Sequence, residues 1–255
     1  MTSLAASLMG WIRRHVDSTN ADGLVVGLSG GIDSATVARL CQLAMPDRVV
    51  GVILPCHSDP QDAADAALVA EHFELPTVTV NLDATYDTLA TELRAALEQV
   101  PTAGGRISDA HRARLPLANL KPRLRMASLY YVANATNYLV AGTGNRSELA
   151  IGYYTKYGDG GVDLLPLGNL LKTEVRSLAH EIGVPTPIID KPPSAGLWAG
   201  QTDEAEMGFS YEALESYLRD GPGDVSPALA LRIERLTRAS EHKRALPPRP
   251  PLDLS

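Results

Sequence analysis

A short polar motif between an apolar run and a helical pattern is the part of this sequence most able to do chemistry. The motif is Ser-Gly-Gly-x-Asp-Ser, at residues 29–34. Its glycines allow backbone N–H groups to converge on an oxyanion, and a helix beginning near Asp33 would point its positive end at the same place. Asp33 is a poor direct ligand for phosphate but a good ligand for Mg²⁺. The motif therefore predicts a phosphate site with a bound magnesium ion, the alternative being a capped turn with Asp33 or Ser34 as N-cap.

Two common phosphate-binding motifs do not fit this stretch. The Walker loop, G-x-x-x-x-G-K-[ST], requires a lysine, and no lysine follows these glycines. The Rossmann fingerprint requires G-x-G-x-x-G and an acidic residue at the end of the second strand. The second apolar run, residues 48–54, is followed by Pro-Cys-His-Ser instead. The phosphate site therefore belongs to another class.

The apolar pattern around the motif predicts the elements that position it. Short β-branched runs cover residues 23–29, 48–54 and 77–82, and helical spacing covers residues 33–45 and 60–73. Strand–helix–strand repeats of this length pair in parallel through right-handed crossovers. We therefore expect a parallel α/β sheet with helices on both faces and ligands at the carboxyl ends of the strands.

The rest of the chain is expected to complete the same core. We expect, in order, a helix over 86–100, a polar glycine-containing connection over 101–120, a helix over 121–137 and a strand over 138–144. The tail at 246–255 is rich in proline and is predicted not to be helical. Residues 1–255 are predicted to form a single domain.

Composition narrows the classes of partner. The chain has 255 residues, 45% of them hydrophobic, and a net charge of −7, which argues against a nucleic-acid groove or an anionic membrane surface. Its two cysteines, Cys41 and Cys56, have no metal-binding spacing and fit a reducing cytoplasm. No apolar run approaches the roughly 20 residues of a membrane span. The N-terminal stretch is interpreted as a packed amphipathic helix, not a signal peptide, with one face formed by Leu4, Leu8, Trp11 and Ile12.

The motif at 29–34 resembles the pyrophosphate loop of the N-type ATP pyrophosphatases. That superfamily, with its adenine nucleotide alpha hydrolase-like fold, splits ATP between the α and β phosphates. It activates a carboxyl, carbonyl or amide oxygen as an adenylate. The resemblance implies a reaction type and leaves the substrate open.

Four later blocks specify the branch of that superfamily. In order along the chain, they are residues 119–126, 142–175, 191–208 and 241–248. Together they resemble the ammonia-dependent NAD synthetases, and the resemblance covers essentially the whole chain. It implies a homodimeric, Mg²⁺-requiring ligase that uses ATP to amidate deamido-NAD with ammonia, the last step of NAD biosynthesis.

The resemblance also assigns residues to ATP and its metal. Asp33 and Glu148 are expected to hold Mg²⁺, the alternative for Glu148 being a residue that only starts a helix. Lys172, a predicted catalytic residue, is expected to contact the phosphates, the alternative being a solvated helix residue. The predicted ATP-binding residues are Ser29, Gly30, Gly31, Asp33, Ser34, Thr143, Lys172 and Ser194.

A second set of residues is implied to handle the other two substrates. Asp159, in a Gly-Asp-Gly-Gly sequence, is expected to act near the incoming ammonia, unless it only stabilises its own turn. A substrate with two phosphates and two riboses needs cationic forks and hydroxyl acceptors. The family usually has alanine where Pro122 stands, a departure that a helix's first turn would tolerate. The predicted deamido-NAD ligands are Arg123, Lys156, Asp163, His242 and Lys243. The alternative for Arg123 is a salt bridge at the surface, and its neighbour Arg125 is expected to be equally exposed.

The expected reaction passes through an adenylate. The nicotinate carboxylate attacks the α-phosphorus of ATP, pyrophosphate leaves, and ammonia then displaces AMP. Free ammonia is the expected nitrogen source, because Cys41 and Cys56 do not indicate a glutamine-hydrolysing module. The segment 192–206 is expected to be mobile and to close over ATP.

Three other functions remain open at this point. A paralogue could amidate another small carboxylate. A tRNA-modifying adenylase would need a basic surface or zinc-binding cysteines, and this acidic sequence has neither. A non-catalytic regulator would tolerate loss of the metal-binding acids, yet Asp33 and Glu148 are both present.

Overall fold

The computed structural model describes residues 3–100, 110–194, 196 and 202–250. Its centre is a parallel sheet with strand order β3-β2-β1-β4. The strands are β1 (Gly23–Leu28), β2 (Val49–Ile53), β3 (Thr77–Thr79) and β4 (Tyr138–Ala141). The α-helices are α1 (Ser3–Ser18), α2 (Ile32–Ala44), α3 (Pro60–His72), α4 (Asp83–Glu98), α5 (Ala110–Thr136), α6 (Arg146–Ile151), α7 (Lys172–Glu181), α8 (Thr186–Ile189), α9 (Asp203–Met207), α10 (Tyr211–Asp220), α11 (Pro227–Ala239) and α12 (Glu241–Arg244), and η1 (Pro222–Asp224) is a 3₁₀ turn.

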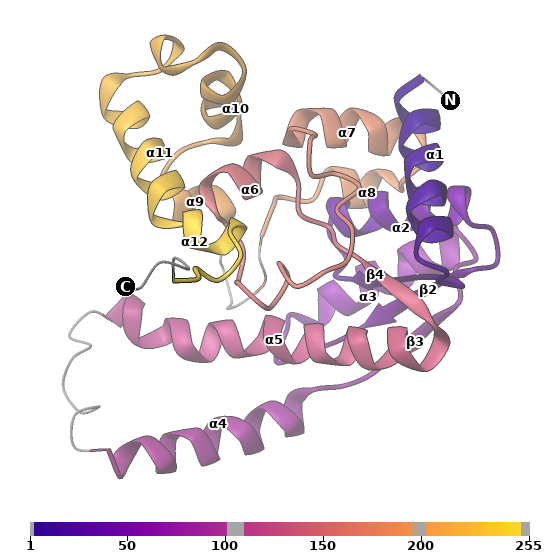
Figure 1. Cartoon of the computed structure of the whole chain (residues 1–255), viewed down its shortest axis with the longest axis horizontal. Coiled ribbons are helices and arrows are strands. Elements are labelled where there is room, and N and C mark those ends of the chain that lie inside the picture. Colours follow the sequence, from indigo (N-terminus) through magenta and orange to yellow (C-terminus); the bar gives the residue numbers. More distant parts are fainter. Residues whose placement is uncertain (1–2, 101–109, 195, 197–201, 251–255) are drawn as a thin grey trace.

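Helices cover both faces of the sheet, as predicted (Figure 1). Successive residues of a strand point to opposite faces. Leu24 and Val26 of β1 pack with α1, α2, α3, α7 and α8, whereas Val25 packs with α5. Both faces are therefore apolar, which explains why the strand sequences are continuous hydrophobic runs.

The C-terminal helices form a separate apolar cluster beside the sheet. Figure 1 shows α9, α10, α11 and α12 grouped around α6. The buried side chains of this cluster are Ile151, Met207, Tyr211, Leu214 and Ile233. Since Ile151 belongs to α6, the cluster fixes the helix that follows β4.

The predicted connection over 101–120 is wrong from residue 110 onward, where α5 already begins. Pro116 and Pro122 both lie inside this helix. The stretch was predicted to be a connection because it is polar and contains glycine. Each proline also removes one helical hydrogen bond, so no local pattern favours a helix that runs through both. Tertiary packing outweighs that loss, since Ala118 and Lys121 are buried.

Two other elements differ in detail from the prediction. The run at 77–82 gives only the three-residue strand β3 at an exposed edge. Helix α1 is present, but its buried face is rotated from the predicted one, and Leu4 is 39% exposed. The buried residues are Ala5, Met9, Ile12 and Val16. Among the helices of the described ranges, none is both long and apolar enough to cross a membrane.

Candidate active site

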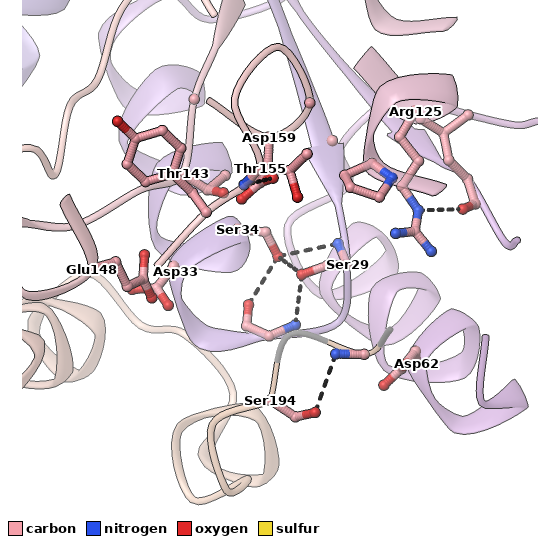
Figure 2. Close-up of a pocket in the computed structure, with 18 of the residues that line it drawn as sticks. Ser29, Asp33, Ser34, Asp62, Arg125, Thr143, Glu148, Thr155, Asp159 and Ser194 are labelled. Atoms are coloured by element: carbon pink, nitrogen blue, oxygen red, sulfur yellow. Dashed lines mark hydrogen bonds between the residues drawn. The ribbon is translucent and has the colours of Figure 1, made fainter. Parts of the chain in front are cut away.

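A cavity of about 500 Å³ opens at the carboxyl ends of β1, β2 and β4 (Figure 2). Its walls include residues 27–29 after β1, 52–55 after β2 and 141–143 after β4. Ligands bind at this edge in open parallel sheets. Helix α5 supplies another wall through side chains spaced three or four residues apart: Leu115, Asn119, Pro122, Met126 and Leu129.

The glycine loop between β1 and α2 is shaped by contacts that exclude side chains. Gly30 has φ +79°, and a Cβ there would stand 2.4 Å from the carbonyl oxygen of Asp62. This glycine packs against α3 and so faces away from the cavity, while Ser29, Gly31, Asp33 and Ser34 line it.

The N-terminus of α2 is left available to the cavity. The N-cap residue is Gly31, so the capped-turn alternative with Asp33 or Ser34 as N-cap is wrong. The Ser34 hydroxyl donates instead to the Gly31 carbonyl oxygen at 2.9 Å and accepts from the Ser29 amide at 3.2 Å. Amide groups at such a helix start can bind an anion.

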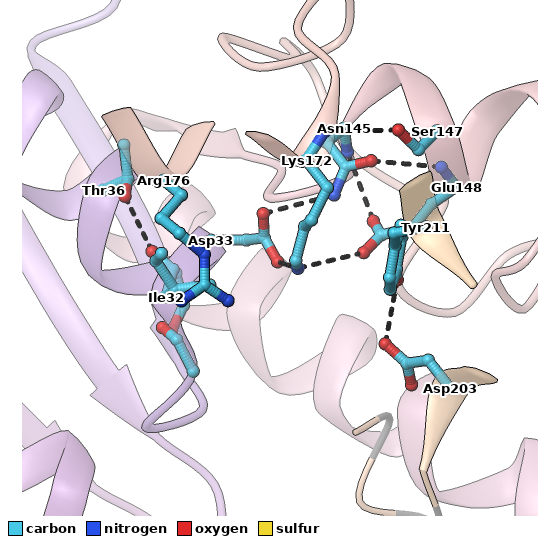
Figure 3. A network of polar contacts seen from close by, with 12 residues as sticks. Ile32, Asp33, Thr36, Asn145, Ser147, Glu148, Lys172, Arg176, Asp203 and Tyr211 are labelled. Atoms are coloured by element: carbon cyan, nitrogen blue, oxygen red, sulfur yellow. Dashed lines mark hydrogen bonds and ion pairs between the residues drawn. The ribbon is translucent and has the colours of Figure 1, made fainter. Parts of the chain in front are cut away.

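Two acids and a lysine from three separate elements meet beside this loop (Figure 3). The Lys172 ammonium, at the start of α7, donates a hydrogen bond to Asp33 of α2. Its Nζ also lies 3.7 Å from Oε1 of Glu148 in α6. The Asn145 side chain donates to the other carboxylate oxygen of Asp33 at 3.2 Å. Lys172 is 6% exposed, so the alternative of a solvated helix residue is wrong.

Glu148 is held in place by a capping box. Its backbone N–H donates to the Asn145 side chain at 3.0 Å, and its Oε2 accepts from the Asn145 backbone N–H at 3.2 Å. The other carboxylate oxygen stays directed at Lys172. Glu148 therefore does start a helix, as the alternative proposed, and also lines the cavity.

The charges in this cluster depend on one another. Burial and the charge of Asp33 raise the pKa of Glu148 to about 8, against the opposing effect of Lys172. Burial alone would lower the pKa of Lys172, but the two carboxylates outweigh it and hold that pKa above its usual range. Crowded carboxylates of this kind are stabilised by a further cation.

The two carboxylates fit a magnesium ion bound together with phosphate. Within the described residues, no cluster of three or more His, Cys, Asp or Glu side chains is arranged to hold a metal. Mg²⁺ is typically held by one or two carboxylates plus substrate phosphates and waters. Asp33 and Glu148 supply such a pair at the mouth of the glycine loop.

Asp159 lies in a turn at another wall of the same cavity. It accepts a hydrogen bond from the Thr155 amide at 2.8 Å, so it does stabilise its turn. It is also open to the cavity (Figure 2), and the protein packed around its carboxyl raises its pKa. Both alternatives for this residue therefore remain compatible with the structure.

Two further predicted ATP ligands line the cavity. Thr143 follows β4, and Ser194 lies near the loop, with its hydroxyl accepting from the Gly196 amide at 3.1 Å. Residues 195 and 197–201 of the segment 192–206 lie outside the described residues, so its predicted mobility and closure over ATP stay a prediction.

Unlike the predicted ATP ligands just described, most of the predicted deamido-NAD ligands do not line the cavity. Lys243 lines the cavity, and its Nζ donates to the carbonyl oxygens of Gly152 and Tyr154, both at 2.6 Å. Among the described residues that line the cavity, the other four predicted ligands are absent. Arg123 donates to the Lys156 carbonyl oxygen at 3.4 Å, and Lys156 donates to that of His242.

Asp163 is separate from the Arg123–Lys156–His242 series. Its carboxylate accepts from the Tyr130 hydroxyl at 2.9 Å and from the Val140 amide at 2.8 Å. Those bonds tie it to α5 and β4.

Sequence reasoning missed several residues that line or support the site. Arg125 was expected to be exposed, and this is wrong: its guanidinium donates to the Leu54 carbonyl oxygen at 3.0 Å and to the Ser58 hydroxyl at 2.9 Å. Burial lowers its pKa. Asn145 and Tyr211 were also missed. If the start of α5 had been predicted correctly, its helical spacing would have indicated which side chains face the cavity, Arg125 among them. No local sequence pattern marks Asn145 or Tyr211.

Known proteins similar to this chain belong to one family of enzymes. Residues 4–247 match the family described as NAD synthase. An NH(3)-dependent NAD(+) synthetase of Carboxydothermus hydrogenoformans is 51% identical over 96% of both chains. Among solved structures, an NMN synthetase from Francisella tularensis has a TM-score of 0.86 with 35% identity, covering 97% of both chains. An NH3-dependent NAD synthetase from Campylobacter jejuni, in complex with the nitrate ion, has a TM-score of 0.77 with 26% identity, covering 98% of this chain and 100% of that one.

Proposed function

The chain belongs to the NAD synthase family, and from that premise we propose how its site amidates deamido-NAD with ammonia at the expense of ATP. The protein is a ligase that forms a C–N bond in the last step of NAD biosynthesis. The observation that carries the mechanism is the convergence of Asp33, Glu148 and Lys172 beside the glycine loop. The three residues are far apart in sequence and meet only at the ligand edge of the sheet.

ATP is required because a carboxylate is a poor electrophile. Direct displacement by ammonia would expel oxide, whereas the adenylate expels AMP, a far better leaving group. The nicotinate carboxylate therefore attacks the α-phosphorus, pyrophosphate departs, and ammonia then attacks the adenylated carbonyl. The protein contributes positioning and charge neutralisation, not a covalent intermediate.

Each side chain then has a defined task. Lys172 places a buried cation at the phosphates, and the first-turn amides of α2 receive phosphate oxygens. Asp33 and Glu148 would hold Mg²⁺, whose charge offsets that of the triphosphate when it is bound. Ser29, Ser34, Thr143 and Ser194 supply hydroxyl groups around the same cavity.

Asp159 serves the second half of the reaction. Only neutral ammonia has a lone pair, so the nucleophile loses a proton as the C–N bond forms. Asp159 opens onto the cavity with a raised pKa, which suits a carboxylate that accepts or steers that proton. Purified enzyme should use ammonium salts and not glutamine as the nitrogen source, because Cys41 and Cys56 are both buried, whereas a nucleophilic thiol must be accessible.

A homodimer is part of this proposal. Helix α4 has a single buried residue, Ala90, and it exposes Leu93 by 47% and Leu97 by 57%. Figure 1 shows α4 lying along the outside of α5, away from the sheet. A second copy of the chain would cover this apolar face. Light scattering of the wild type and of Leu93→Glu measures the oligomeric state, and a monomeric wild type would contradict the dimer.

We also assign the enzyme to the cytoplasm, where ATP and pyridine nucleotides are available.

A smaller substrate is the second candidate. The likeness to an NMN synthetase, together with the position of Arg123, Lys156 and His242 outside the cavity, favours amidation of the deamido form of NMN. The chemistry would be the same, and only the ligands for the second nucleotide would be unused.

One experiment tests both candidates. The enzyme is incubated with ATP, Mg²⁺ and ammonium, with either deamido-NAD or its mononucleotide counterpart, and the amide product and AMP are measured. A higher kcat/KM for deamido-NAD supports the first proposal, and a higher value for the mononucleotide supports the second. Formation of neither product would contradict both.

A further inference from the structure

Helix α10 carries a buried carboxylate outside the cavity. Glu215 is 2% exposed. Within the part of the chain that the structure describes, no lysine, arginine or histidine forms a salt bridge with it. A buried carboxylate is retained only if hydrogen bonds compensate its lost hydration. The partners of Glu215 therefore indicate what it does.

Those partners belong to the two helices that carry Glu148 and Lys172. Glu215 Oε1 accepts from the Thr173 amide at 3.0 Å, and Oε2 accepts from the Thr173 hydroxyl at 2.6 Å. Oε1 also lies 3.4 Å from the Ser147 hydroxyl, a longer contact. Thr173 directly follows Lys172, and Ser147 directly precedes Glu148.

The bridge is closed by the backbone of the lysine itself. The Lys172 amide donates to the Ser147 hydroxyl oxygen at 3.2 Å. Glu215, Thr173, Lys172 and Ser147 thus form one connected network between the first turn of α6 and the first turn of α7. The positive end of α7 also stabilises the carboxylate.

The same face of α10 reaches the end of the lysine side chain. Tyr211 lies four residues before Glu215, one helical turn away. Its ring is 5.4 Å from Lys172 Nζ, and its hydroxyl donates to Asp203 at 2.9 Å. Helix α10 therefore contacts the Lys172 ammonium through Tyr211 and binds the backbone N–H of the next residue, Thr173, through Glu215.

We propose that Glu215 is a positioning residue for adenylation: it sets the distance between α6 and α7, so that Glu148 and Lys172 face Asp33 together. This inference rests on the proposed function. A displacement of about 1 Å in such an arrangement can cost on the order of 100-fold in rate. Glu215 itself touches no substrate.

The test compares Glu215→Ala with Glu215→Gln. The alanine variant leaves Thr173 and Ser147 without their acceptor, and we expect kcat for pyrophosphate release to fall about 10- to 100-fold with KM for ATP changed less than about threefold. The glutamine variant can accept from the Thr173 amide and donate to its hydroxyl, so we expect it to retain kcat within about threefold.

Two control variants separate positioning from stability. Glu212→Ala removes an exposed carboxylate from the same helix. Ile233→Ala opens the apolar cluster around α10 without removing a partner of Thr173. Glu212→Ala should keep wild-type kcat per folded molecule. Ile233→Ala, whose cluster includes Ile151 of α6, should lose much less kcat per folded molecule than Glu215→Ala. Hydrogen exchange of the Thr173 amide gives a readout independent of activity, and it should accelerate in Glu215→Ala alone.

The outcomes are distinguishable. An active wild type with unchanged kcat in Glu215→Ala would overturn the inference and leave the proposed function intact. Equal losses of kcat in Glu215→Ala and Ile233→Ala, or equal losses in the alanine and glutamine variants, would also overturn it. A wild-type enzyme that releases no pyrophosphate would overturn the proposed function and this inference with it.

Discussion

Beside the glycine loop, Lys172 is buried between the carboxylates of Asp33 and Glu148, whereas Arg123 and His242, which do not line the cavity, are exposed. Arg123, Lys156 and His242 are called the rim below. The buried groups bind one another through their side chains. The rim groups are joined through backbone carbonyl oxygens, as in the contact from Lys156 to His242. The buried charges are therefore compensated by one another, whereas at the rim no opposite charge faces Arg123 or Lys156 in the part of the chain that the structure describes.

The difference fits the roles proposed for the two groups of residues. Groups that stabilise charge during phosphoryl transfer act best when they need no rearrangement at the moment of reaction. Groups that recognise a remote part of the substrate can be ordered by the substrate itself. We therefore expect substitutions at the buried end to lower kcat, and substitutions at the rim to raise KM.

The largest effect is expected from Asp33→Asn and Glu148→Gln. Each variant replaces a carboxylate that is proposed to bind Mg²⁺ with an amide, and pyrophosphate release should fall by about 100-fold or more. The fold should persist, because the side chains keep their size. Pyrophosphate assays and circular dichroism measure the two properties, and near-wild-type turnover in either variant would exclude the metal assignment.

Asp159→Asn should have a smaller and more selective effect. Amidation should fall about 10- to 100-fold, while adenylation changes less, because the carboxylate acts on ammonia. The raised pKa of Asp159 means that its carboxylate forms at higher pH than in free aspartate. Amidation by the wild type should therefore decline as pH falls through that raised pKa, and the rate at fixed total ammonium should rise with pH.

The comparison for Asp159 uses two assays on the same preparation. Pyrophosphate release without ammonium reports adenylation, and NAD formation with ammonium reports the complete reaction. Equal losses in both assays would assign Asp159 to its turn alone, in keeping with its bond to the Thr155 amide.

At the rim, Arg123→Ala should raise KM for deamido-NAD by about three- to tenfold and leave KM for ATP unchanged. A tenfold change corresponds to about 1.4 kcal/mol, a reasonable value for one solvent-exposed charged contact with a ligand. Steady-state kinetics with each substrate varied in turn measures this. If KM for deamido-NAD does not move, the rim does not bind the second nucleotide, and the mononucleotide candidate gains support.

The smallest effect concerns the thiols. Burial raises the pKa of Cys56 and that of Cys41, so neither is a thiolate at neutral pH. Both should react slowly with an aromatic disulfide reagent in the native protein and rapidly in urea. Activity should be little changed by Cys56→Ala, and rapid native labelling with loss of activity would indicate a functional thiol.

Much of the fold could be predicted because it depends on local patterns. The strands β1, β2 and β4 and the helices α2 and α3 follow from apolar runs and helical spacing. The predicted start of α5 was wrong, because no local pattern favours a helix through Pro116 and Pro122 and only the packing of the helix against the sheet outweighs them.

The sequence by itself determined the loop at 29–34, since its glycines, its serines and Asp33 lie next to one another. It also indicated Glu148 and Lys172 through their resemblance to family motifs. Only the tertiary structure decided that these three side chains meet, because Asp33 and Lys172 are 139 positions apart. It also decided that Arg125 is turned inward and that Glu215 joins α6 to α7. Burial and long-range hydrogen bonds set those positions, and no local pattern of residue types encodes them.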